Sequence, residues 1–361
     1  MIVFFLFVVV ILIRLCYHLY FFRALSAWKA IDTKEETKEG VSIVVCNKNN
    51  ANGLKKLVPA LLNQVYDNFE VILVDDFSSD ESWQFMRSIA NSKVIAIQAF
   101  TDKPGKKVAL SQGIAQAKHD WILVTDADCL PDGNQWVQTM MKYTNKYDVV
   151  LGYGPNQKAL DFVHHFARFE TTMTALQYLT FALKDLPYMG VGRNLLYRKS
   201  LYHEVGGFAS HNHLSSGDDD LFIQSIIGRA DIGICVEQST FMYSQSKGTW
   251  KEFIQQKIRH VSTATSYSSA SKFLLALLSF SHVSSWILLI CCLIVGGKIG
   301  LYASIAFLVY CLLTVVNVYK PFRMLGSSDL LSKFVFMDFA FFVYYIIMSP
   351  FIIYHKRQVW N

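Results

Sequence analysis

Residues 121–128 read Trp-Ile-Leu-Val-Thr-Asp-Ala-Asp, an apolar stretch that ends directly in two carboxylates. Its β-branched and aromatic residues predict a short buried strand. Side chains alternate between the two faces of an extended backbone, so Asp126 and Asp128 point the same way. Two such carboxylates suit a hard cation, Mg²⁺ or Mn²⁺. An acidic pair of this spacing is more often a solvated turn, and the position at a strand end is what favours the metal.

The same strand pattern occurs three times upstream. Short β-branched runs occupy 41–45, 71–75 and 94–97, and helical spacing occupies 53–65 and 80–90. Strands that alternate with helices predict an α/β fold with a mostly parallel sheet covered on both faces. Ligands of such sheets lie beyond the carboxyl ends of the strands. Acidic residues of this chain occur at those ends.

Long apolar segments lie at both ends of the chain, which has 361 residues, 52% of them hydrophobic. Residues 1–22 lack the basic start and small-residue cleavage site of a signal peptide, so they predict a retained membrane helix. Three further segments, about 273–295, 299–316 and 334–354, are near the ~20 residues that span a bilayer. We therefore expect one N-terminal and up to three C-terminal transmembrane helices.

The basic residues predict the orientation. Arg14, Arg23 and Lys29 follow the first apolar run, and cationic residues collect on the cytosolic side of membrane helices. The domain that follows is therefore expected in the cytosol. If all three C-terminal segments span, the basic residues 355–357 fall outside, against this rule. Either the last segment, interrupted by Pro350, re-enters or lies shallow, or the rule fails here.

These patterns divide the chain into five parts. Residues 1–22 are an anchor, 23–40 a charged linker, 41–262 the α/β domain with an interfacial helix, 273–354 the C-terminal membrane segments and 355–361 a tail.

Composition excludes several other classes of protein. The net charge of +6 comes without a dense Lys/Arg block, so no nucleic-acid partner is expected. The seven cysteines show no CxxC or Cys/His spacing, which indicates reduced thiols and no zinc site. The chain has neither GxSxG nor HExxH, the motifs of common serine hydrolases and zinc proteases.

Other polar residues carry candidate chemistry. Asp75-Asp76 closes a predicted strand, where a carboxylate can bind a base or ribose or can simply cap a turn. Lys103–Lys107 precede a helix and could meet phosphate or lie in solvent. Another helix follows three acids, Asp218, Asp219 and Asp220. One acid suffices to cap a helix. Adjacent carboxylates raise one another's pKa, which suits a general base.

The pattern of residues 255–260 predicts a cationic interfacial helix.

Taken in order, these segments resemble the family 2 glycosyltransferases. The matching motifs are Val41–Asn49, Asp75-Asp76, Gly105–Leu110, Asp126/Asp128, Gly190–Asn194, Asp218–Leu221 and Gln256–His260. Gly217 stands where the family has Glu, and His260 stands where its QxxRW element has Trp, which weakens any claim of processive synthesis. The resemblance covers about residues 41–262.

This resemblance implies a GT-A fold and an inverting transfer from a nucleotide-diphospho-sugar, most often a UDP-sugar, to a lipid-linked or glycan acceptor. It assigns catalysis to Asp218 and Arg259, and a divalent metal (Mg²⁺ or Mn²⁺) to Asp126 and Asp128. It places Gly192, Arg193 and Asp219 at the acceptor. The nucleotide-sugar would contact Asn47, Asp75, Asp76, Lys106, Asp126 and Gln256. The expected location is the cytosolic face of a cell membrane, a bacterial inner membrane.

Two alternatives are a membrane-anchored, non-catalytic nucleotide-binding regulator and a transporter component. The first does not need both the acidic pair and the Asp218 cluster. The second is favoured by Asp338 alone, an acid within an apolar segment.

Overall fold

The computed structural model describes residues 1–361 except 33–36, 101–104, 215, 247, 262 and 354–361. Its contacts divide the chain into two compact units. The first contains Met1–Trp28, Lys158–Leu186 and the described part of 247–356; the second contains Lys29–Gln157 and Pro187–Ser246. Residues of the range 41–262 therefore occur in both units, and the predicted domain boundaries stay a prediction.

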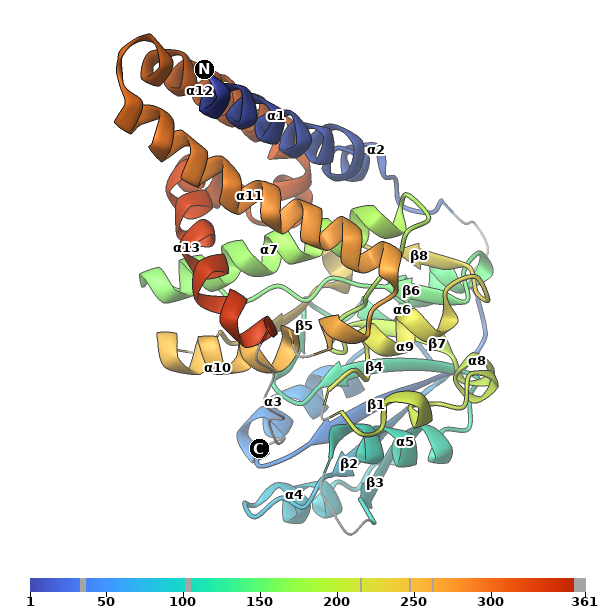
Figure 1. Ribbon diagram of the computed structural model, residues 1–361. Helices are drawn as coiled ribbons and strands as arrows, with labels where there is room; N and C mark the ends of the chain where they lie inside the picture. The colour runs from blue at the N-terminus through green and yellow to red at the C-terminus, as the bar shows by residue number, and fades with distance from the viewer. Residues whose placement is uncertain (33–36, 101–104, 215, 247, 262, 354–361) are drawn as a thin grey trace. The chain divides into compact units, whose positions relative to one another are not determined.

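The second unit is built on a mixed sheet (Figure 1). Its strands are β1 (Val41–Asn47), β2 (Phe69–Asp75), β3 (Val94–Gln98), β4 (Trp121–Asp126), β5 (Cys129–Pro131), β6 (Val149–Leu151), β7 (Leu195–Arg198), β8 (Ile232–Ile234) and β9 (Met242–Ser244). Seven of them form one sheet in the order β3-β2-β1-β4-β7-β6-β8, and β5 pairs with β9. Strands β1–β4 are parallel, and β7 runs antiparallel to β4 and β6. The predicted α/β fold with a mostly parallel sheet is confirmed.

Helices cover this sheet. They are α3 (Ala51–Leu62), α4 (Ser82–Ser88), α5 (Lys106–Gln116), α6 (Trp136–Lys142), α8 (Lys199–Glu204) and α9 (Asp220–Ile226), with short 3₁₀ turns η2 (Tyr143–Asn145), η3 (Ala209–His211) and η4 (Gln238–Thr240). Every residue of β1 and β2 is buried, as expected for parallel strands that are covered on both faces. Helix α5 packs on these two strands, and this packing fixes where its first residue, Lys106, lies.

The first unit is helical. It contains α1 (Ile2–Tyr17), the π-helix η1 (His18–Phe22), α2 (Ala24–Ala27), α7 (Phe162–Ala182), α10 (Trp250–Val261), η5 (Ala264–Ser266), α11 (Ser269–Val295), α12 (Gly297–Met324), η6 (Ser328–Lys333) and α13 (Phe334–Ile353). Among the described residues, four helical segments are long and apolar enough to cross a membrane: Ile2–Ala27, Ser269–Val295, Gly297–Met324 and Ser328–Phe351. One N-terminal and three C-terminal apolar helices were predicted, and this prediction is confirmed.

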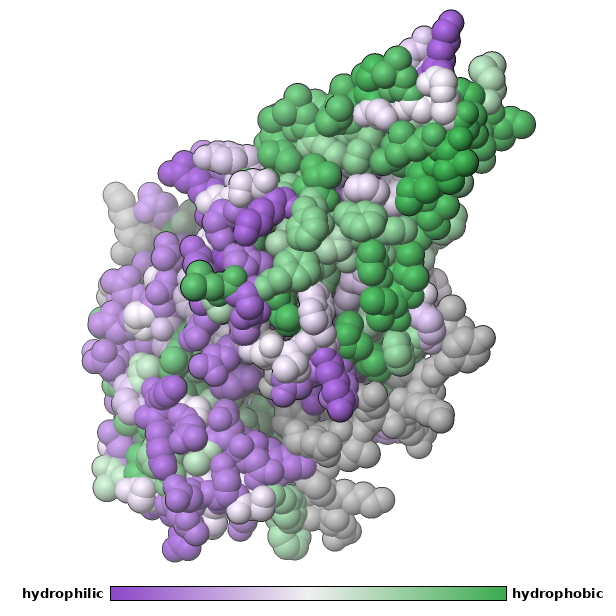
Figure 2. Space-filling view, turned by 90° about the vertical axis from the view of Figure 1, so that its left-hand side faces the viewer, coloured by the Kyte–Doolittle hydropathy of each residue, from purple (hydrophilic) through white to green (hydrophobic). Residues whose placement is uncertain are grey.

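The outward faces of these helices are apolar. Phe5, Leu308 and Val316 are each about two-thirds exposed, at 67%, 68% and 66%. Hydrophobic side chains cover the surface of the long helices in Figure 2. An exposed apolar surface of this extent indicates contact with lipid.

A buried ion pair lies among the four membrane-length helices of the first unit. Arg14, only 2% exposed, donates from Nη1 to Ser285 Oγ (2.8 Å) and from Nη2 to Asp338 Oδ1 (2.8 Å). Trp286 Nε1 donates to the other oxygen of Asp338 (2.9 Å), and the guanidinium lies 4.7 Å from the ring centroid of Tyr310. Helices α1, α11, α12 and α13 therefore meet at one hydrogen-bonded pair of charges.

We expect Arg14→Met and Asp338→Leu each to lower the thermal unfolding midpoint of the detergent-solubilised protein strongly. Each leaves a buried charge without its partner, a change that typically costs ~3–5 kcal/mol. The double variant leaves neither charge, so it should recover more than half of the loss. Purely additive losses in the double-mutant cycle would contradict this coupling.

Candidate functional site

Polar residues of three adjacent strands meet at one edge of the sheet in the second unit. In the parallel register, Asn47 of β1 lies opposite Asp75 of β2, and Cys46 lies opposite Asp126 of β4. Because parallel strands end at the same edge, the residues predicted to bind nucleotide and metal become neighbours.

Lys106 joins two of the predicted site residues. Its Nζ lies 2.9 Å from Asp126 Oδ1 and 2.8 Å from Asp218 Oδ2. The Lys106 and Asp218 side chains are only 11% and 7% exposed, whereas that of Asp126 is 30% exposed. The first acid of the Asp126/Asp128 pair and the predicted base therefore share one cation.

The balance of burial and charge keeps this lysine protonated. Burial alone would lower the pKa of Lys106, but attraction from Asp126, Asp218 and Asp219 outweighs it and raises the pKa well above its ordinary value. Lys106 is thus a permanent cation in the site, and it is unsuited to act as a base.

A glycine-containing loop lies directly against this cluster. A Cβ atom on Gly192 would come within 3.1 Å of Lys106 Nζ and 3.2 Å of Asp218 Oδ2, so a side chain there would crowd both groups. The backbone N–H of Gly192 donates to Asp219 Oδ2 (2.7 Å). Asp219 Oδ1 in turn accepts from the N–H of Asp220 and caps α9. Of the residues assigned to the acceptor, Gly192 and Asp219 therefore touch one another beside Asp218.

The surroundings of Asp219 raise its pKa. Burial, followed by the charges of Asp218 and Asp220, raises the pKa of Asp219 to about 8. Asp219 therefore holds a proton at neutral pH, which limits the negative charge around Asp218.

The β1 and β2 ends offer acceptors for a ligand. Within the described residues, Asn47 Oδ1 and Asp75 Oδ1 are buried without a hydrogen-bond partner. Buried oxygens are normally paired, so two neighbouring exceptions indicate a place for donors from a ligand. The next residue, Asp76, accepts a hydrogen bond from the N–H of Gly105 (3.0 Å) and so ties the start of α5 to β2.

Asp126 and Asp128 also fit a metal. Ligand atoms of Asp126, Asp128 and Cys129 lie within 4.8 Å of one another. Burial, with the nearby carboxylates, raises the pKa of the Cys129 thiol well above its ordinary value, so this sulfur stays neutral. Mg²⁺ and Mn²⁺ prefer oxygen ligands and leave positions for phosphate or water. The two carboxylates, one of them exposed, are therefore the donor set that such an ion would use.

The remaining predicted residues have other surroundings. Arg193 Nη1 donates to Ser244 Oγ (2.6 Å) and to the Gly154 carbonyl (3.3 Å), contacts that hold its loop against β9. Gln256 and Arg259 lie on α10, which belongs to the first unit. Their assignment to the donor and to catalysis stays a prediction. Lys103, in the basic loop, lies outside the described residues.

Sequence reasoning did not identify the partners of two lysines in this site. It assigned Lys106 to the nucleotide-sugar, which stays a prediction, and the structure pairs this lysine with Asp126 and Asp218. Lys107 was not singled out, although its ammonium is buried and bonded to backbone carbonyls of His211 and Ser216. Two adjacent lysines at a helix start were the available signal, but Asp218, His211 and Ser216 lie more than 100 residues away along the chain.

Comparisons with known proteins identify similar sequences. Residues 42–206 match the family described as Glycosyl transferase family 2. Poly-beta-1,6-N-acetyl-D-glucosamine synthase of Staphylococcus aureus is 28% identical over 137 residues, 37% of this chain and 33% of the relative. Glycosyltransferase GlyG of Streptococcus pneumoniae is 31% identical over 117 residues, 32% of this chain and 38% of that protein. The matched part is thus about a third of the length of these curated relatives.

A solved structure resembles the whole chain. The mannosyltransferase PcManGT of Pyrobaculum calidifontis, in complex with GDP-Man and Mn²⁺, aligns with a TM-score of 0.58 at 15% identity, over 95% of this chain and 98% of that one. At this identity the likeness shows the fold, the GT-A fold that the sequence predicts. Together with the family match, which covers strands β1 to β7 and ends before Asp218, it leads to one assignment: residues 42–206 of this chain are those of a glycosyl transferase family 2 domain.

Proposed function

We propose that this glycosyltransferase moves a sugar from a nucleotide-diphospho-sugar to a hydroxyl of a lipid-linked or glycan acceptor, with inversion at the anomeric carbon. The observation that carries the proposal is the bridge from Lys106 to both Asp126 and Asp218. It joins Asp126, the acid proposed on the donor side, and Asp218, the acid proposed on the acceptor side, to one ammonium. An in-line displacement needs the leaving group and the base on opposite sides of one reacting carbon.

Asp218 acts as the general base in this scheme. Its carboxylate takes the proton of the acceptor hydroxyl as the oxygen attacks the anomeric carbon. The bond from that carbon to the phosphate oxygen breaks, and its electron pair leaves with the nucleoside diphosphate. Lys106, whose Nζ lies 2.8 Å from Asp218 Oδ2, orients this carboxylate in the site.

The leaving group gains negative charge and needs stabilisation. Asp126 and Asp128 would hold Mg²⁺ or Mn²⁺, which acts as a Lewis acid on the diphosphate. Lys106 adds a fixed positive charge near Asp126. Arg259 and Gln256 of α10 are proposed to contact the donor, as the family motif implies.

The unpaired oxygens of Asn47 and Asp75 support a nucleoside site at the ends of β1 and β2. Asp76 holds the α5 start that carries Lys106, and so links this site to the diphosphate. Uridine is the proposed base, because the family most often uses UDP-sugars. A screen of nucleotide-sugars in membranes that contain the protein, with release of nucleoside diphosphate as the readout, identifies the donor.

The helical unit supports an acceptor at a membrane. A lipid-linked sugar, or a glycan that leaves through the bilayer, stays near its surface, and the long apolar helices keep the enzyme there. The proposed location is a bacterial inner membrane with the α/β unit in the cytosol. Gly192, Arg193 and Asp219 are proposed to line the acceptor side.

Asp218→Asn should reduce sugar transfer by about 10²–10⁴-fold, because the amide cannot take the proton of the acceptor hydroxyl. Binding of the nucleoside diphosphate should change little. Transfer is measured at saturating donor, and Asp231→Asn, an exposed acid of the same unit, is the matched control. Activity of the Asp218 variant within tenfold of wild type rejects the base assignment.

Removal of divalent metal should abolish transfer, and Mn²⁺ or Mg²⁺ should restore it. Asp128→Asn should raise the Mn²⁺ concentration for half-maximal activity at least tenfold, because it replaces a charged carboxylate ligand with a neutral amide. Cys129→Ser should leave this concentration within about threefold, since the neutral thiol is a poor ligand for hard ions. The assignment fails if the two variants change the metal requirement equally.

A further inference from the structure

Helix α13 has the length of a membrane span, but it contacts α7 repeatedly. Phe334 and Phe341, seven residues apart, both pack on Phe169, with ring centroids at 6.0 and 5.9 Å. Tyr344, further along α13, packs on Phe166 at 5.7 Å. Helix α13 therefore keeps contact with α7 from Phe334 to Tyr344.

The contacts with α11 give the direction of α13. Phe339 packs on Trp286 (5.0 Å), and Tyr345, further along α13, packs on His282 (5.4 Å). As α13 proceeds, its partners thus move back toward the start of α11. Tyr344 also packs on Phe253 of α10, the helix that precedes α11 (6.0 Å). Figure 1 shows the end of α13 beside α10, away from the turn between α11 and α12.

Helices α7 and α10 carry ion pairs of their own. Arg168 of α7 donates to both carboxylate oxygens of Asp329, at 2.8 and 2.9 Å. Glu170 of α7 forms an ion pair with Lys257 of α10. Among the described residues, neither helix qualifies as a candidate span. Helix α13, whose later residues contact both helices, therefore ends at their depth and not on the opposite side of the bilayer.

The outer surface of these three helices has the composition of a membrane interface. Phe162, Trp250 and Phe336 form an exposed aromatic ridge, with 41%, 41% and 58% of each residue exposed. The Phe162 ring lies 5.7 Å from Trp250 and 5.4 Å from Phe336. Lys251 follows Trp250 directly, and Lys333 lies three residues before Phe336; both lysines are exposed. Aromatic rings and lysines collect at the level of the lipid headgroups.

We propose that α7 and α10 lie in the headgroup region of the bilayer, on the side where α11 begins, and that α13 returns to this side without crossing. Near Asp338, which bonds Arg14 of α1, α13 lies deeper, beside the middle of α11. The sequence adds a separate argument, because basic residues follow α13 at 355–357. A returning α13 satisfies the positive-inside rule, whereas a crossing α13 does not.

Reporters fused after Asn361 of the full chain test the side on which α13 ends. A fluorescent protein that matures only in the cytosol should be bright, and alkaline phosphatase, active only outside, should be silent. The same reporters inserted at Lys298, in the turn between α11 and α12, should give the opposite pattern. Active phosphatase after Asn361 overturns the proposal.

A labelling experiment gives the same answer without a fusion. Phe351→Cys, near the end of α13, should react with a membrane-impermeant maleimide in inside-out vesicles and not in intact cells. Lys298→Cys should behave in the reverse way. Labelling of Phe351→Cys in intact cells overturns the proposal.

A different observation concerns Lys107, the second lysine of α5. It is 4% exposed, and its Nζ donates to the backbone carbonyls of His211 and Ser216, the latter at 3.0 Å. Gly217 follows with φ of +103°, a conformation that favours glycine, and Asp218 comes next. The lysine thus holds the backbone directly before the proposed base.

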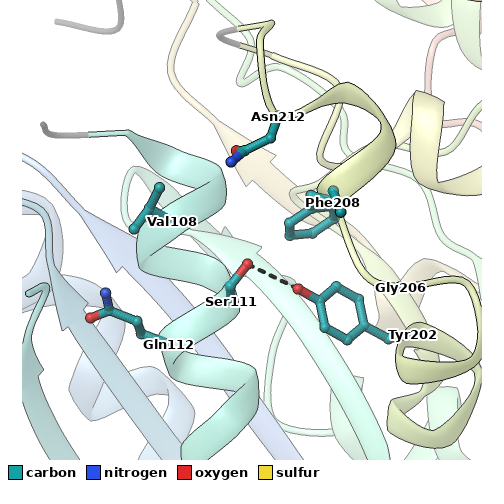
Figure 3. A pocket seen from close by; sticks show the side chains of 8 residues that line it. Val108, Ser111, Gln112, Tyr202, Gly206, Phe208 and Asn212 are labelled. Carbon is teal, nitrogen blue, oxygen red and sulfur yellow. Dashed lines mark hydrogen bonds between the residues drawn. The ribbon is translucent and has the colours of Figure 1, made fainter. Parts of the chain in front are cut away.

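The outer face of α5 also bonds helix α8. Ser111 Oγ and Tyr202 OH lie 2.9 Å apart at the edge of a cavity of about 390 Å³, which Val108, Phe208 and Asn212 also line (Figure 3). The cavity separates α5 from α8 and η3 below Lys107, so packing there is incomplete. The ammonium of Lys107 is therefore a main link between α5 and the backbone before Asp218.

We infer that Lys107 is a positioning residue that presents Asp218 to the acceptor; this inference rests on the proposed role of Asp218 as base. Lys107→Met should lower kcat about 10–100-fold and leave the KM for the donor nearly unchanged. Lys107→Arg should retain most of the activity. A merely structural role predicts instead a lower unfolding midpoint, with kcat intact in the folded fraction.

The pH profile gives an independent readout. Burial lowers the pKa of Lys107 to about 8, against the opposing charges of Asp218 and Asp220, while His211 beside it is neutral because burial lowers its pKa to about 4. Loss of the ammonium should therefore reduce kcat as pH rises through about 8. Arginine stays charged, so Lys107→Arg should lack this decline. Activity of Lys107→Met within threefold of wild type, or a decline that persists in Lys107→Arg, overturns the inference; if Asp218→Asn is fully active, the base assignment fails instead.

Discussion

The ammonium of Lys106 between Asp126 and Asp218 is the constraint on which the second unit depends. Carboxylates brought together at one sheet edge repel each other by ~4 kcal/mol per pair at 4 Å and an effective dielectric constant of 20. Lys106 offsets this repulsion for two acids, and the proton on Asp219 removes a further charge. A metal ion bound by Asp126 would compete with Lys106 for the same carboxylate. Under the proposed mechanism, donor binding and the surroundings of Asp218 are therefore linked through one side chain.

The parallel half of the sheet follows from the sequence, because burial on both faces requires uninterrupted apolar runs. Strands β1 to β4 have this pattern, and each was predicted within a few residues of its observed bounds. The later strands β5, β6, β8 and β9 have three residues each, too few to show a period. Helix α7 was also missed as a separate element, because it combines apolar residues with buried charges whose partners, such as Asp329 and Lys257, are distant in sequence.

The site was predictable to the extent that it depends on strand ends. Asn47, Asp75 and Asp126 meet because parallel register forces them to, and the spacing of the acids alone indicates this. The contact of Lys106 with Asp218 and the contact of Lys107 with the Ser216 carbonyl were not predictable. Both contacts depend on how the 211–218 backbone returns to α5, and no local sequence pattern encodes a contact over more than 100 residues.

Asp338 illustrates how the same limit affects functional interpretation. An acid in an apolar helix is a reason to consider transport, since burying an unpaired charge in lipid is costly. Here Arg14 and Trp286 occupy its two oxygens, although Arg14 lies 324 residues away in sequence. A charge that is fully paired within the bundle requires no transported ion to explain it. The residues proposed to carry the reaction lie at the strand ends of the α/β unit. The Arg14–Asp338 pair instead holds the apolar helices together.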